Sequence, residues 1–154
     1  MNKDVVMTRE EFLVYAGHFN AKEYDKVVSY FNPDCTVEYP DKLMLGPQTP
    51  RIAHGPGEFI SRYAALHENL REFLDLRIFL SDDKNMIVEF QTEFHCIKET
   101  DYFEGHMKVG DHIAVNQFCV YDFDENGKFS RIRISHHRVL SNAPGFIPLH
   151  SYDE

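Results

Sequence analysis

The segment Val120-Tyr121-Asp122-Phe123-Asp124-Glu125-Asn126-Gly127-Lys128-Phe129 decides the fold of this chain. Residues before its turn alternate in polarity, as on a half-buried strand. The Asn-Gly pair in the turn at residues 124–127 is a strong hairpin signal. The sequence therefore predicts two antiparallel strands, at about residues 112–123 and 129–140.

Strand patterns extend outward from this hairpin. Residues 73–80 and 86–97 have apolar, strand-like patterns, and the polar residues 81–85 form a turn between them. Residues 35–39 alternate as a short strand, and the Pro-rich segment 41–54 is either a hairpin or a lid-like loop over a site. Residues from 141 onward, with two prolines, are expected to form an irregular tail.

Helix signals occupy the N-terminal half. Thr8 and Glu11 have capping-box spacing, and apolar residues then recur at helical spacing as far as Phe31. The first thirty residues therefore form two helices or one bent helix, ending at Asn32-Pro33. Gly55-Pro56-Gly57 opens a third helix that continues to about residue 70.

The order of these elements predicts an α+β fold. Residues 1–154 are expected to form one domain, with a core at about 8–140 and a tail at 141–154. Three helices can cover a long antiparallel sheet only if the sheet curls around them. A curved sheet wrapped around N-terminal helices makes a cone-shaped barrel, whose central pocket suits a small molecule.

Composition excludes several classes of protein. The 154 residues are 43% hydrophobic and 27% charged, which excludes intrinsic disorder. A net charge of -9 without a Lys/Arg cluster excludes nucleic-acid binding and disfavours an anionic membrane surface. Three cysteines in apolar runs, with no leader or membrane-spanning pattern, predict a cytoplasmic protein.

Several strings resemble the SnoaL-like branch of the nuclear transport factor 2-like superfamily. They are residues 32–39, 55–60, 120–129 and 131–138, together with the amphipathic start at 9–31. The resemblance covers residues 8–140 and is greatest to small fungal members of natural-product pathways. It implies relatives among polyketide cyclases, scytalone dehydratases and ketosteroid isomerases.

Glu93 and His95 are the strongest catalytic candidates. Residues two apart on a strand share a face, so both could meet one substrate. Epoxide-hydrolase-like relatives carry an acid/base pair at this spacing, and dehydratase-like relatives carry a histidine where His95 stands. The dehydratase resemblance also implies hydrogen-bond donors at Tyr39 and Asn116. His136, which continues an apolar alternation on its strand, is a second proton donor.

Two features leave alternatives open. The dehydratases' Tyr-Asp pair falls on Phe19-Asn20, and the hydrolases' Asp-Arg-Asp set is missing. The resemblance therefore implies neither of these two activities in full. On the strand of Glu93 and His95, Phe94 belongs to the opposite, apolar face, so simple patterning would expose His95 to solvent. Four helical residues are core or pocket wall: Tyr15, Phe19, Tyr63 and His67.

The sequence predicts a cofactor-independent acid–base enzyme of the lyase, isomerase or cyclase type. Its expected substrate is a small, largely apolar metabolite, such as a polyketide or terpenoid intermediate. The alternatives are a binding module without chemistry and a hydrolase of an epoxide or lactone. No metal motif occurs among the nine histidines. A homodimer through the outer sheet face is expected, with Phe90, Phe94, Phe118 or Val120 as contact residues according to strand parity.

Overall fold

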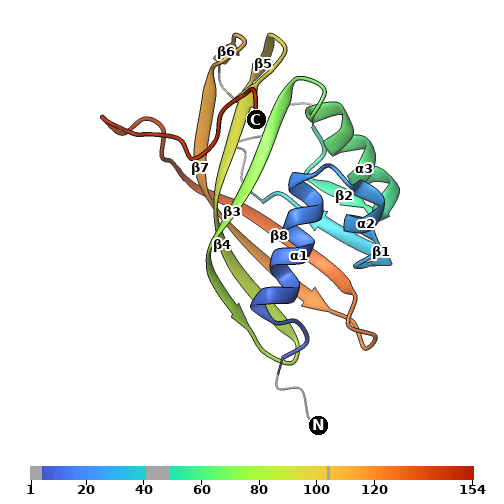
Figure 1. Ribbon diagram of the computed structural model, residues 1–154. Coiled ribbons are helices and arrows are strands. Elements are labelled where there is room, and N and C mark those ends of the chain that lie inside the picture. The colour runs from blue at the N-terminus through green and yellow to red at the C-terminus, as the bar shows by residue number, and fades with distance from the viewer. Residues whose placement is uncertain (1–4, 41–48, 104) are drawn as a thin grey trace.

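A computed structural model describes residues 5–40, 49–103 and 105–154 of the chain. Six strands form one curved sheet in the order β2-β1-β8-β7-β4-β3, and β5 and β6 form a separate hairpin. Figure 1 shows the helices on one side of this sheet and the C-terminal tail on the other. The helices are α1 (Arg9–Asn20), α2 (Tyr24–Val28) and α3 (Gly55–Leu66). The strands are β1 (Phe31–Glu38), β2 (Ile52–His54), β3 (Leu70–Ser81), β4 (Asn85–Cys96), β5 (Thr100–Tyr102), β6 (Gly105–Met107), β7 (His112–Phe123) and β8 (Phe129–Val139).

The predicted α+β class, curved sheet and central hairpin are confirmed. Gly127 has a φ of 75°, and the Asp124 carboxylate accepts hydrogen bonds from the backbone N–H groups of Asn126 and Lys128. β3, β4, β7 and β8 form the expected antiparallel meander. β1 extends the sheet by pairing in parallel with β8, and β2 pairs with β1 at the edge.

The N-terminal segment forms two helices, and their predicted end is wrong. α2 stops at Val28, and β1 already begins at Phe31, so Asn32-Pro33 lies inside a strand. Pro33 cannot donate a ladder hydrogen bond, and the register of β1 against β8 shifts between Phe31 and Thr36. The irregular strand therefore accommodates the proline.

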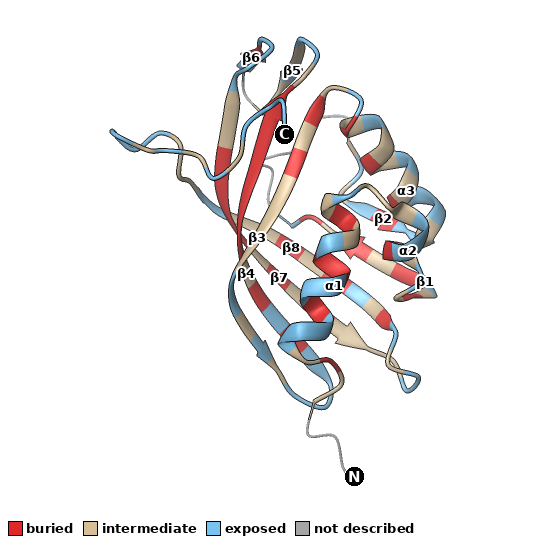
Figure 2. Ribbon diagram, in the orientation of Figure 1, coloured by how far each residue is buried: buried red, intermediate tan, exposed pale blue. Residues whose placement is uncertain are grey.

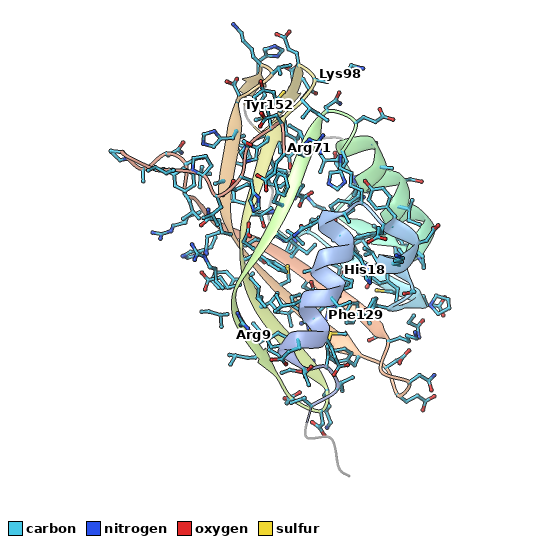
Figure 3. All side chains as sticks on the ribbon, in the orientation of Figure 1. Arg9, His18, Arg71, Lys98, Phe129 and Tyr152 are labelled. Atoms are coloured by element: carbon cyan, nitrogen blue, oxygen red, sulfur yellow. The ribbon has the colours of Figure 1, made fainter. Side chains whose placement is uncertain are left out.

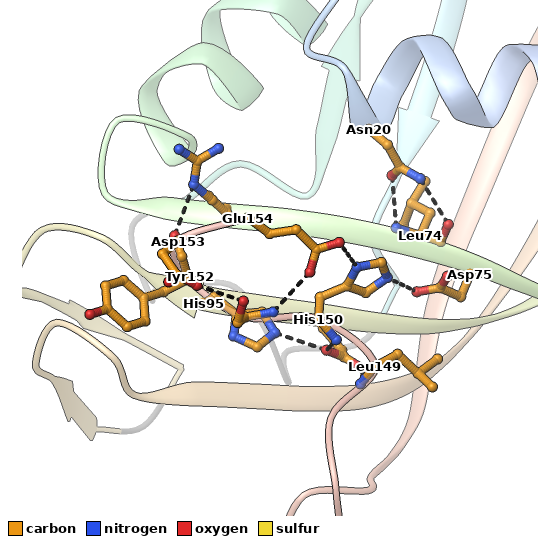
Figure 4. A network of polar contacts seen from close by, with 12 residues as sticks. Asn20, Leu74, Asp75, His95, Leu149, His150, Tyr152, Asp153 and Glu154 are labelled. Carbon is orange, nitrogen blue, oxygen red and sulfur yellow. Dashed lines mark hydrogen bonds and ion pairs between the residues drawn. The ribbon is translucent and has the colours of Figure 1, made fainter.

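Helix α1 is capped at its start and attached to the concave face of the sheet at its end. At its start, the Thr8 hydroxyl accepts from the Glu11 N–H and the Glu11 carboxylate accepts from Thr8, completing the capping box. At its end, the Asn20 amide donates to the Leu74 carbonyl at 3.0 Å and accepts from the Leu74 N–H at 2.8 Å (Figure 4). The Asn20–Leu74 hydrogen bonds therefore hold the end of α1 against β3.

An aromatic core lies between α1 and the sheet. Phe12 is fully buried, and its ring lies within 5.5 to 5.7 Å of the rings of Tyr15, Phe79, Phe90 and Tyr121. Figure 2 shows buried positions on the sheet side of α1 and along the central strands. This core fills one half of the cone and leaves the other half for a cavity.

The loop expected at residues 41–54 is only partly described. Residues 41–48 lie outside the described part of the chain, while Ile52–His54 forms β2 against β1. Helix α3 then starts at Gly55, whose φ of 77° suits glycine, and an added Cβ would lie 3.2 Å from the Pro33 carbonyl oxygen. No helix of the described residues is long and apolar enough to cross a bilayer.

Candidate active site

A cavity of about 840 Å³ opens between α3, the concave face of the sheet and the β5–β6 hairpin. Apolar and aromatic side chains make up much of its wall, among them Tyr63, Leu66, Phe94, Tyr102, Phe103 and Ile134. A few polar groups converge on the same space from separate elements. These groups include Tyr39, Arg62, Glu72, Gln117 and His136. An apolar hollow with few polar groups is the usual form of a small-molecule site.

Glu72 is a buried carboxylate in this wall, with 6% of its surface exposed. It reaches the cavity because β3 places Leu70, Glu72 and Leu74 on the concave face. The imidazole of His67 lies behind it, with Nε2 2.9 Å from the Glu72 Oε1 atom. A buried carboxylate with one hydrogen-bonded side and one open side can take a proton from a bound molecule.

A third residue extends this chain away from the cavity. The Tyr24 hydroxyl lies 2.6 Å from His67 Nδ1, and the two rings stack at 5.9 Å. When Glu72 is ionised it accepts from the Nε2–H of a neutral His67, so Nδ1 accepts the hydroxyl proton of Tyr24. Tyr24 is only partly buried. The chain therefore connects a cavity carboxylate with the edge of the protein.

Tyr39 and Tyr63 bring a pair of hydroxyls to the same cavity. Their Oη atoms are 2.5 Å apart, so one hydroxyl donates to the other and the second keeps a free proton. Burial raises the pKa of both tyrosines, and the negative charge of Glu72 adds to the increase at each. Both side chains therefore keep their hydroxyl protons at neutral pH. A protonated hydroxyl is what is needed to donate a hydrogen bond to an oxyanion.

The mouth of the cavity is formed in part by the β5–β6 hairpin. His106 lies 2.6 Å from carboxylate oxygens of both Asp101 and Glu99. These hydrogen bonds raise the pKa of the exposed His106 imidazole. Each of these two strands has only three residues, too few to give a strand pattern in the sequence.

The structure divides the predicted site residues between the two faces of the sheet. Tyr39, Tyr63 and His136 line the main cavity. Tyr15 and Phe19 line a small deeper pocket of about 30 Å³ instead. His67 stands behind the wall as the partner of Glu72.

The expectation that Glu93 and His95 face the cavity is wrong. Phe94, between them, lines it, so both neighbours point to the outer face of β4. Asn116 is also on the outer face, where its amide donates to Glu89 at 2.6 Å, while Gln117 faces inward. The expected shared site of His95, Glu93, Tyr39 and Asn116 does not form, because the sheet separates Tyr39 from the other three.

Glu93 and His95 are nevertheless buried, because the C-terminal tail covers them. The Glu93 carboxylate accepts from the Leu149 N–H at 2.7 Å, from the His150 N–H at 3.1 Å and from His95 at 2.8 Å. Burial opposes the ionisation of Glu93, but these hydrogen bonds and one from Gln91 outweigh it and lower its pKa to about 2. Glu93 therefore serves as the ionised anchor of the tail.

Further contacts hold the tail on the same face (Figure 4). The His150 ring stacks on Phe73 at 4.1 Å, and its Nε2 atom lies 2.7 Å from the Asp75 carboxylate. Arg71 donates to the Tyr152 carbonyl at 3.0 Å, and Figure 3 shows these two residues near each other on the upper part of the sheet. The solvent-facing alternative for His95 is thus also wrong, since only 2% of the residue is exposed.

Sequence reasoning missed Glu72, Gln117 and Tyr24, the partner of His67. The signal for Glu72 was present, because a lone acid interrupts the apolar alternation of Leu70, Leu74 and Leu76. The predicted strand began at residue 73 and therefore did not include Glu72. In the described part of the chain, no three His, Cys, Asp or Glu side chains are grouped as metal ligands.

Comparison with known proteins places the fold. The chain matches no protein-family model and no curated protein. It is similar to a candidate polyketide cyclase from Xanthomonas campestris (TM-score 0.65, 16% identity, covering 82% of this chain and 87% of that one). It is also similar to an NTF2-like protein of unknown function from Burkholderia pseudomallei (TM-score 0.66, 15% identity, covering 85% of this chain and 92% of that one). A ketosteroid isomerase-like protein from Erwinia carotovora atroseptica gives 0.59 at 14% identity, with 90% and 99% covered. The chain therefore has the NTF2-like cone fold.

Proposed function

We propose that this NTF2-like chain is a cofactor-independent acid–base enzyme of the lyase, isomerase or cyclase type. Its substrate is a small, largely apolar metabolite with an enolisable carbonyl group, such as a polyketide or terpenoid intermediate. One observation carries the proposal: the buried Glu72 carboxylate and the Tyr39–Tyr63 hydroxyl pair line the same apolar cavity. Neighbours of the same fold that are described as cyclases or isomerase-like support the reaction class through fold alone.

In this mechanism Glu72 acts as the general base. It removes a proton from the carbon next to the substrate carbonyl, whose oxygen gains negative charge as the proton leaves. The free hydroxyl of the Tyr39–Tyr63 pair donates a hydrogen bond to that oxygen. The protonated Glu72 then returns the proton to another carbon or to the leaving group. His67 fixes the carboxylate from behind, and its bond to Tyr24 fixes the imidazole.

His136 and Gln117 have supporting roles in the proposal. Both face the cavity from neighbouring strands, paired in register with each other. Gln117 accepts from the Thr92 hydroxyl at 3.2 Å, which orients its amide. We assign Gln117 to substrate orientation and His136 to proton donation on the mouth side, as the sequence predicted for that histidine.

The same geometry distinguishes the two alternative functions, a hydrolase and a binding module. The hydrolase hypothesis required a water held by Tyr39, Asn116 and an acid, and Asn116 lies on the opposite face of the sheet. The binding-module hypothesis keeps the cavity and drops the chemistry. Ligand binding without proton exchange would support it.

Solvent-deuterium exchange tests the proposal. Two apolar ketones, 2-tetralone and 5-androstene-3,17-dione, serve as probes, and NMR in D₂O follows exchange of their α-protons. We expect the wild type to exceed the buffer rate with at least one ketone and Glu72→Gln to lose about 10² to 10⁴ of that acceleration. Glu89→Gln, a matched carboxylate on the outer face, should keep it. Binding of both ketones without any acceleration would contradict catalysis.

We also propose that the chain forms a cytoplasmic homodimer. Leu80, Ile87 and Val120 are paired across β3, β4 and β7 on the outer face, and Leu80 and Ile87 are 63% and 45% exposed. Phe118 is on this face, whereas Phe90 and Phe94 face inward, so strand parity leaves only Phe118 and Val120 of the predicted contacts. Three buried free cysteines favour a reducing compartment. Sedimentation of the wild type as a dimer and of Ile87→Glu as a monomer would support the assembly. A fungal origin stays a prediction.

A further inference from the structure

Arg62 is a cation placed in the cavity wall by α3. One guanidinium nitrogen, Nη2, donates to the Pro50 carbonyl at 3.0 Å. The guanidinium carbon lies 5.1 Å from the centre of the Tyr39 ring, a cation–π distance. These two contacts fix the group beside the Tyr39–Tyr63 pair, and Tyr63 is the next residue on the helix.

The other terminal nitrogen of Arg62 has no partner. Nη1 is buried and makes no hydrogen bond to any described residue. No ion pair links Arg62 to a carboxylate in the described part of the chain either. A buried guanidinium donor without an acceptor is costly, because it has lost water and gained nothing in return.

The carboxylates of the cavity do not meet this need. Glu72 is bound to His67 at 2.9 Å, and Asp101 is bound to His106 at 2.6 Å. Both acidic groups among the described residues of the wall thus have a histidine as their partner. The unmet donor of Arg62 remains the site in this wall where an anion gains most.

We propose that Arg62 forms a carboxylate-binding subsite, so that the substrate is an apolar acid rather than a neutral molecule. When the flexible Arg62 side chain turns its buried Nη1 edge toward the cavity, carboxylate oxygens accept from it, and the guanidinium plane suits a planar acceptor. The inference rests on the proposed function only in using the same cavity. Because Arg62 and Tyr63 are adjacent on α3, an acid held at Arg62 would present a nearby carbonyl to the tyrosine hydroxyls.

The test compares a planar acid with its uncharged ester. Naphthalene-2-carboxylate and methyl naphthalene-2-carboxylate are titrated into the wild type, Arg62→Gln and Arg62→Lys by isothermal calorimetry. We expect the wild type to bind the acid at least about tenfold more tightly than the ester, as a charged hydrogen bond allows. Arg62→Gln should remove that preference by weakening the acid alone, and Arg62→Lys should retain part of it.

Controls separate this inference from the proposed function. Arg77→Gln removes an exposed cation of the outer face and should leave both affinities unchanged. Glu72→Gln should lose proton exchange yet keep the acid preference, so failure of catalysis and failure of the subsite give different results. Equal affinity of the wild type for acid and ester, binding of neither probe, or a preference that survives in a folded Arg62→Gln would each overturn the subsite.

Discussion

The His67 imidazole lies 2.9 Å from the Glu72 carboxylate, at a point where helix α3 has just ended and strand β3 has just begun. The α3 cap and the start of β3 thus bring the two side chains together within five residues of sequence. The His67 Nδ1 atom also lies 2.6 Å from the hydroxyl of Tyr24, which belongs to a different helix. The cavity carboxylate is therefore held by a chain of two residues, His67 and Tyr24, which come from other parts of the fold.

Replacing His67 should lower turnover rather than binding. His67→Phe keeps the ring volume and removes both hydrogen bonds, so Glu72 loses its fixed orientation. We expect kcat to fall about 10- to 100-fold, the value of a hydrogen bond to a charged group, with KM nearly unchanged. His67→Gln should recover part of kcat. A rise in KM with kcat unchanged would instead assign His67 to substrate binding.

Removing one hydroxyl of the tyrosine pair should affect the transition state. Tyr63→Phe breaks the 2.5 Å contact with Tyr39 and leaves the ring packed against Phe19 and Phe59. We expect kcat to fall about 10²-fold, as for other oxyanion donors. Unfolding free energy should fall by only about 1 kcal/mol, the usual loss for one hydrogen bond. A variant with normal kcat would remove the pair from the mechanism.

The tail anchor makes a pH-dependent contribution to stability. The pKa of Glu93 is about 2 in the folded chain against an ordinary value of 4.5, so the unfolded state binds the proton more readily. Its contribution is complete above pH 4.5 and is lost as the pH falls toward 2. We expect Glu93→Gln to cost on the order of 3 kcal/mol at pH 7, and the difference from the wild type to shrink in acid. Urea unfolding between pH 2.5 and 7 measures this, with the exposed Glu125→Gln as control. A difference that does not depend on pH would contradict the anchor.

The aromatic core sets the stability of the closed half of the cone. Phe12 is fully buried, whereas its neighbour Leu13 is 45% exposed on the same helix. Phe12→Ala should cost about 3 to 5 kcal/mol of unfolding free energy. Leu13→Ala should change it by less than about 0.5 kcal/mol. Equal losses in chemical denaturation would show that α1 packs differently.

Local signals predicted the fold well because each acts over a few residues. Asn126-Gly127 specified the hairpin, and Thr8 with Glu11 specified the start of α1. The spacing of Glu93 and His95 also correctly placed them on one face, where they hydrogen bond. What the pattern could not determine was which face is inward.

The reason is that both faces of β4 are buried along residues 91–96. One face lines the interior, and the other lies under a tail that contacts Glu93 from 56 residues away in the sequence. Such a contact leaves no periodic signal near the strand. The cavity carboxylate was missed for a related reason. Glu72 becomes part of a site only where β3, α3 and β1 come together in the fold.

The central claim is that chemistry occurs on the concave face of the sheet, at Glu72, and not on the outer face, at Glu93. The direct measurement is the rate of α-proton exchange in D₂O of the ketone that the wild type accelerates, with Glu72→Gln and Glu93→Gln side by side, each first shown to be folded at the assay pH. The account predicts that Glu72→Gln falls to the buffer rate while Glu93→Gln stays close to the wild type. Loss of exchange in Glu93→Gln with full exchange in Glu72→Gln would contradict it.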